Sequence, residues 1–126
     1  MKKTPIESLL HLRPHPDELV QAGQDLARAA ELIEQHGWTQ HQMVTYRGCM
    51  CALGAMRKAV TGNAAPEVRA QPGQGRRIDM AVCVVRVSAS VRSIVAFNDK
   101  RGTTQQHVVN ALRRAAEEAP TILEHY

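Results

Sequence analysis

The chain has 126 residues with a net charge of +4; 44% of them are hydrophobic, 22% charged and 3% aromatic. This length is typical of one domain with a single modest core, and the composition excludes a disordered or fibrous chain. No apolar run approaches the roughly 20 residues that span a bilayer, and the first residues lack the apolar segment of a signal peptide. We therefore expect a cytoplasmic protein without a membrane partner, in which the three cysteines are free thiols.

Charge is distributed unevenly along the chain. Residues 1–46 hold 4 Lys or Arg against 6 Asp or Glu, residues 47–114 hold 12 against 3, and residues 115–126 add 3 acidic residues. A basic middle could meet phosphates or an acidic surface. We favour the simpler interpretation, a solvated basic face that the acidic first helix neutralises.

The first part of the chain predicts an arm followed by a long helix. Residues 1–16 contain three prolines and show no sustained period, so they are expected to form a proline-rich arm. Apolar and small residues then recur at helical spacing over residues 17–36, with Gly23 on the buried stripe, where another helix could approach closely. Gly37 ends this helix.

The next part predicts a short insertion, a second helix and a loop. Residues 39–48 are polar and then alternate, which is typical of a short hairpin or an irregular segment. The second helix begins near Cys49 or Cys51 and runs to about Thr61. Residues 64–77 carry two prolines and two glycines, and they predict a mobile surface loop.

Residues 79–95 support two interpretations. Valines alternate with polar residues there, which favours a half-buried strand, yet the same segment fits one face of a helix. The last main helix is clearer, since Thr103 and Gln106 form a predicted capping box and Pro120 terminates the helix.

A set of short motifs occurs in a recognisable order: Trp38, Cys51-Ala-Leu-Gly-Ala55, Asn98-Asp99, Gly102-Thr103 and Val109-x-x-Leu112-x-x-Ala115-Ala116. This order resembles a family of small uncharacterised proteins from actinobacteria and their phages, over residues 19–119. Members of that family carry Trp-Asn-Asp where this chain has Phe97-Asn98-Asp99. The resemblance implies a helix for residues 79–95 and an all-α fold, and it brings no activity.

The expected architecture is a mostly all-α, compact bundle of about four helices. It comprises a proline-rich N-terminal arm over residues 1–16 and a single helical domain over residues 17–126, with a short irregular or β-hairpin insertion before the second helix.

Cys51 carries the main catalytic hypothesis. It stands where a helix is predicted to begin, and the positive end of a helix favours the reactive thiolate. His36 or His41 could then act as a base, oriented by Asn98 or Asp99. In the alternative interpretation Cys51 is a small buried residue, while Asn98 and Asp99 bond the loop and the free N–H groups of the last helix. We favour the alternative, because no histidine position is compelling, and assign no catalytic residue.

A zinc site is a second chemical hypothesis. Its ligands would be His36, His41, Cys49 and Cys51. Structural zinc sites usually use a Cys-x2–4-Cys spacing, which the Cys-x-Cys pair of this chain does not match. We therefore assign no metal and no cofactor.

Basic residues could form a nucleic-acid face. They are Arg57, Lys58, Arg69, Arg76, Arg77, Arg86, Arg92, Lys100, Arg101, Arg113 and Arg114. No helix-turn-helix is recognisable and aromatic stacking platforms are missing, which leaves only weak electrostatic binding.

The favoured function is that of a small interaction or regulatory protein that binds a host or partner macromolecule. If a phage encodes it, it would work in the host cytoplasm. Arg76, Arg77, Lys100 and Arg101 are the predicted partner contacts, because they are expected in loops. A cysteine-dependent enzyme centred on Cys51 and a nonspecific nucleic-acid binder are the alternatives.

Overall fold

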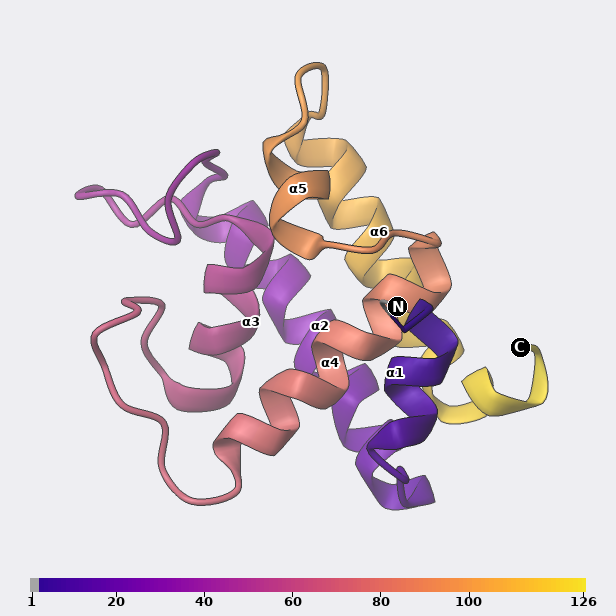
Figure 1. The fold of residues 1–126 in the computed structure, drawn as a ribbon. Helices are drawn as coiled ribbons and strands as arrows, with labels where there is room; N and C mark the ends of the chain where they lie inside the picture. The colour runs from indigo at the N-terminus through magenta and orange to yellow at the C-terminus, as the bar shows by residue number, and fades with distance from the viewer. Residues whose placement is uncertain (1–2) are drawn as a thin grey trace.

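Six α-helices and a C-terminal 3-10 helix make up the regular structure of residues 3–126, which this computed structural model describes (Figure 1). They are α1 (Pro5–His11), α2 (Pro16–His36), α3 (Ala52–Thr61), α4 (Gln74–Ala89), α5 (Ile94–Asp99), α6 (Gln105–Glu118) and η1 (Ala119–Glu124). No strand occurs within these residues. The all-α prediction is confirmed, and the prediction of about four helices is too low. None of the described helices is both long and apolar enough to cross a membrane.

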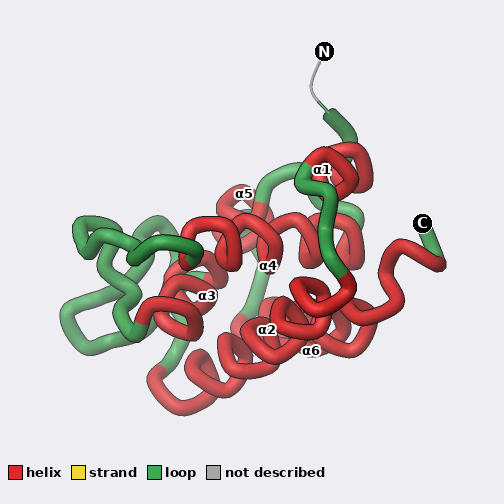
Figure 2. The backbone as a smooth tube through the Cα atoms, turned by 90° about the horizontal axis from the view of Figure 1, so that it is seen from below, coloured by secondary structure: helices red, strands yellow, loops and turns green. Residues whose placement is uncertain are grey.

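Helix α2 organises the core. It packs against α3, α4, α6 and η1, and Figure 2 shows α6 lying beside it. At Gly23 a Cβ atom would lie 2.9 Å from the Ala116 carbonyl oxygen, so the backbones of α2 and α6 meet there. The close helix approach predicted at Gly23 is therefore present. The largest fully buried side chains around it include Leu26, Ile33 and Leu112.

Helix α4 explains why residues 79–95 look ambiguous in sequence. The segment is helical up to Ala89, Ser90 then adopts a left-handed conformation with φ 55°, and α5 begins at Ile94. Because α4 contacts α1, α2, α3 and α6, it buries residues on several sides. Both Val84 and Val85 are buried, for example, which obscures a one-sided helical period.

The proline-rich start of the chain is more ordered than predicted. Residues 5–11 of the expected arm form α1, whose Leu9 is fully buried, and α1 packs against α4. Prolines are expected to interrupt helices, but Pro5 and Pro16 stand in the first turns of α1 and α2, where the missing N–H is not needed.

Two element boundaries also differ from expectation. Helix α4 begins at Gln74, so Arg76 and Arg77 lie in its first turn and not in the loop predicted over residues 64–77. The capping box of the last helix is formed by Thr104 and His107, one residue after the predicted pair.

The insertion before α3 is irregular, and a hairpin is absent among the described residues. Two isolated bridges join Met50 to Trp38 and to Val44, and neither extends into a strand. A turn at Thr45–Gly48, closed by the Gly48 N–H and the Thr45 carbonyl at 2.9 Å, forms its tip. Backbone hydrogen bonds such as Met50 N–H to the Gly37 carbonyl, together with side-chain bonds from α5, hold this segment.

Candidate functional site

Asn98 connects the insertion to the rest of the fold. Its side chain on α5 is fully buried, and its Oδ1 accepts hydrogen bonds from Trp38 Nε1 at 2.8 Å and from the Ala52 N–H at 3.0 Å. Its Nδ2 donates to the Thr39 carbonyl and to Asp99 Oδ1, both at 3.0 Å. A carboxamide has two donor hydrogens and two acceptor lone pairs, so Asn98 uses its full capacity within the protein.

The neighbours of Asn98 extend this connection. Asp99 Oδ1 accepts the His41 N–H at 2.8 Å, and that bond, followed by the bond from Asn98, holds the pKa of Asp99 below its usual value. Gln40 Nε2 donates to the carbonyls of Asn98 at 3.1 Å and of Lys100 at 3.2 Å. Three consecutive residues, 39–41, are therefore bonded to the end of α5.

Part of the predicted bonding was wrong. Asn98 and Asp99 were expected to satisfy N–H groups of the last helix. Asn98 instead accepts from Ala52, the first residue of α3, and Thr104 and His107 cap α6. The capped helix is thus the one that carries the Cys51 motif.

Cys51 is the N-cap of α3, and its Sγ accepts the Gly54 N–H at 3.3 Å. The side chain is buried, and burial raises the pKa of the thiol; the Asp99 charge adds to this increase. The thiol is therefore protonated at neutral pH.

Gly54, three residues later, is required by packing, since a Cβ there would lie 2.1 Å from the Met43 carbonyl oxygen.

A cavity of about 200 Å³ lies beside these residues. It is lined by His41, Gln42, Met43, Cys51, Val95, Asn98 and Asp99. The structure thus brings four of the five catalytic candidates together, and leaves out His36, which is exposed in the last turn of α2.

Their chemistry does not resemble that of an activated nucleophile. The Cys51 thiol stays protonated, and the Asn98 amide has no free donor or acceptor for a substrate. The side chain of His41 is 75% exposed, and its Nδ1 lies 3.9 Å from Asp99 Oδ2. The arrangement forms a shaped, largely apolar recess.

The proposed zinc ligands do not form a site. Within residues 3–126, no three His, Cys, Asp or Glu side chains lie close enough to hold one metal ion. Cys49 turns towards Gly37, where a Cβ would lie 2.9 Å from its Sγ.

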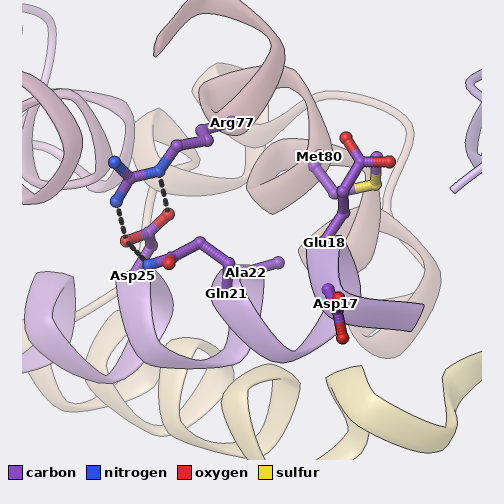
Figure 3. A pocket seen from close by; sticks show the side chains of 7 residues that line it. All are labelled: Asp17, Glu18, Gln21, Ala22, Asp25, Arg77 and Met80. Atoms are coloured by element: carbon purple, nitrogen blue, oxygen red, sulfur yellow. Dashed lines mark hydrogen bonds and ion pairs between the residues drawn. The ribbon is translucent and has the colours of Figure 1, made fainter. Parts of the chain in front are cut away.

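Arg76 and Arg77, two of the predicted partner contacts, are bonded to α2. Arg76 pairs with Glu18 at 2.5 Å and donates to the Leu12 carbonyl at 2.7 Å. Arg77 binds the buried Asp25 through two hydrogen bonds, at 2.7 and 3.2 Å (Figure 3). The 230 Å³ recess beside this pair lies between α2 and α4, and the pair itself belongs to the packing of those helices.

Lys100 and Arg101, the other two predicted contacts, are exposed in the loop after α5. The basic residues that form ion pairs with acidic ones in residues 3–126 are His15, Arg28, His41, Arg76, Arg77, Arg113 and Arg114. Lys100 and Arg101 therefore form no ion pair within residues 3–126, and they follow directly on Asp99, which lines the Asn98 cavity.

Comparison with known protein families identifies a matching family model. Residues 18–118 match a model described as "Family of unknown function (DUF6197)". Neither the curated proteins nor the solved structures contain a match.

Proposed function

This chain belongs to DUF6197, a family of unknown function, and from its surface we propose that it is a small interaction module that binds a partner protein. The binding region is the Asn98 surface, which we define as the 200 Å³ cavity together with its exposed neighbours Lys100 and Arg101.

The bonding of Asn98 carries this proposal. Two of its four hydrogen bonds, with Trp38 and Thr39, fix the irregular segment before α3 against α5, and within that segment only two isolated bridges pair the backbone. A surface that is already ordered loses less conformational entropy when a partner binds. A fully satisfied buried amide at this position therefore suits a preformed binding surface.

The side chains around the cavity indicate the chemistry of the partner. Val95 is 48% exposed at its edge, and Met43 adds a second apolar wall. Lys100 and Arg101, which form no ion pair within residues 3–126, outnumber the single carboxylate of Asp99 beside them. The fitting partner presents an apolar side chain to the cavity and acidic groups to the two basic residues.

An enzyme centred on Cys51 has less support, because burial raises the pKa of the thiol that would have to ionise. Nonspecific nucleic-acid binding also has less support, since Arg76, Arg77 and Arg113 are paired with acidic residues of α2.

The cytoplasm is the proposed location. The free thiols of Cys49, Cys51 and Cys83 suit a reducing compartment. An actinobacterial or phage origin rests on the motif resemblance alone.

The test combines charge reversal with crosslinking. A photo-crosslinking residue at Val95 is introduced into the parent protein, into Lys100→Glu/Arg101→Glu, and into a control, Arg69→Glu/Arg92→Glu, with the same charge change at other exposed loop positions. We expect one specific crosslinked protein with the parent and the control, and loss of that product with Lys100→Glu/Arg101→Glu. Equal crosslinking in all three proteins, or none in any of them, would remove the Asn98 surface from partner binding.

A further inference from the structure

A second cavity lies between α1 and α4 and shares no lining residue with the Asn98 surface. Its volume is about 290 Å³, and its polar lining comprises Lys3, Ser8, His11, Asp79, Cys83 and Arg86. Ser8 and His11 lie on α1, while Asp79, Cys83 and Arg86 lie on α4 at spacings of three to seven residues, which share one helix face. Two elements thus direct several hydrogen-bonding groups to one place.

Arg86 is the unexplained residue of this cavity. Its Nε is buried and has no hydrogen-bond partner, its guanidinium interacts with the Cys83 thiol, and Arg86 takes part in no ion pair within residues 3–126. Arg57 has a similar buried Nε, but its guanidinium donates to the Val68 carbonyl at 2.7 Å. A buried polar group without a partner is destabilising unless a bound ligand satisfies it.

The neighbours of Arg86 identify the charge of that ligand. Lys3 and His11 provide two more nitrogen donors and Ser8 a hydroxyl, against the single carboxylate of Asp79. Burial raises the pKa of the Cys83 thiol, so this group is neutral and does not repel an anion. Arginine, lysine and hydroxyl groups together are the donors that phosphate oxygens accept from most strongly.

We propose that this cavity binds the phosphate group of a small, soluble phosphate monoester. Arg86, Lys3 and Ser8 hold the phosphate oxygens, and Asp79 accepts a hydrogen bond from a hydroxyl of the same molecule. The site is independent of partner binding at the Asn98 surface.

Titration with inorganic phosphate tests the site, at constant ionic strength with chloride as the compensating anion. We expect saturable binding that Arg86→Gln weakens about tenfold or more and that Asp79→Asn strengthens, because that change removes a like charge. Arg69→Gln and Glu67→Gln, exposed in the loop before α4, are matched controls that leave the affinity unchanged. Lys100→Glu/Arg101→Glu also leaves it unchanged, which separates this site from the Asn98 surface.

Two further arms make the result decisive. His11→Gln repeats the test from the exposed α1 side of the cavity, in case Arg86→Gln lowers the melting temperature. Glycerol 3-phosphate distinguishes a soluble monoester from a lipid headgroup, for which vesicles containing phosphatidic acid are the probe. Equal phosphate affinity in the parent, Arg86→Gln and His11→Gln, or binding to the vesicles without binding to glycerol 3-phosphate, would overturn the proposal.

Discussion

At the scale of single residues, Cys51 shows two opposing effects on one thiol. The N-terminus of a helix stabilises a nearby anion by about 0.3–1 kcal/mol, whereas removing a charge from water costs several kcal/mol. Because Cys51 is only 6% exposed, the second effect is larger, and the pKa of the thiol rises. The sequence indicates that Cys51 stands at the start of a helix, but it does not indicate that its side chain is buried.

We predict that Cys51→Ala lowers the free energy of unfolding by about 0.5–2 kcal/mol, because it removes the buried Sγ that caps α3 by accepting the Gly54 N–H. Urea denaturation measures this change, with Cys49→Ala at a half-buried position as the control. Iodoacetamide should alkylate Cys51 more slowly than Cys49 in the folded protein. If Cys51 proved to be the fastest of the three thiols, its structural role would be refuted.

At the scale of elements, α3 is fixed against the preceding segment by one glycine. A Cβ at Gly54 would meet the Met43 carbonyl oxygen at 2.1 Å, while a Cβ at Gly75 in α4 would meet nothing within 4 Å. A methyl group added at Gly54 would therefore clash with the backbone, whereas one added at Gly75 would meet open space.

Gly54→Ala should destabilise the protein by more than the roughly 1 kcal/mol that alanine gains over glycine in a helix. Gly75→Ala should stabilise it by up to about 1 kcal/mol, since Gly75 has ordinary helical geometry and open space. Thermal unfolding of both variants checks the pair. Similar changes in both would mean that the contact with Met43 does not constrain α3.

The pairing of α2 with α4 predicts a dependence on pH. The hydrogen bond from Arg76 lowers the pKa of Glu18 from 4.5 to about 2. A lowered pKa in the folded state adds stability above the unfolded value, and that stability is lost as the pH falls from about 4.5 towards 2.

Glu18→Gln should therefore lower the melting temperature at pH 7 and have little effect near pH 2. The effect at pH 7 should be modest, because the Glu18 and Arg76 side chains are 34% and 45% exposed. Melting curves of parent and variant at the two pH values test this. A difference that stayed constant with pH would contradict a charge-based role for Glu18.

The helices could be predicted from the sequence where one face is buried, as in α2 with Gly23 on its stripe. Two kinds of local signal pointed away from the observed helices. The valines around Val85 do not follow a one-sided helical period, because α4 is buried on several sides. Pro5 and Pro16 hide the helical pattern of the first residues, because they stand where α1 and α2 begin. Both depend on tertiary position, which a local pattern does not contain.

At the scale of the whole molecule, the motif residues were identified from the sequence but their bonding was not. Trp38 and Asn98 lie 60 positions apart, so no local rule indicates that their side chains meet. The charge pattern likewise predicted that acidic α2 pairs with basic residues, but it did not indicate which ones. The structure shows that they are Arg76, Arg77 and Arg113. Lys100 and Arg101 stand out only once these pairs are known.

The loops also show why one buried amide matters to the whole surface. The loops before and after α3, residues 37–51 and 62–73, lie on the same side of the molecule as α3 (Figure 1). The first of them is bonded to α5 through Asn98. Loss of that amide would release the Asn98 surface while α2, α4 and α6 stayed packed.

Amide hydrogen exchange of Asn98→Ala is the most direct measurement of this role. Exchange should accelerate across residues 38–52, including the Ala52 and His41 amides that donate to Asn98 and Asp99, while the amides of α2 and α6 keep their protection. Asn110→Ala, at an exposed position of α6, should exchange like the parent. Unchanged protection of residues 38–52 in Asn98→Ala would contradict the view that Asn98 orders this surface.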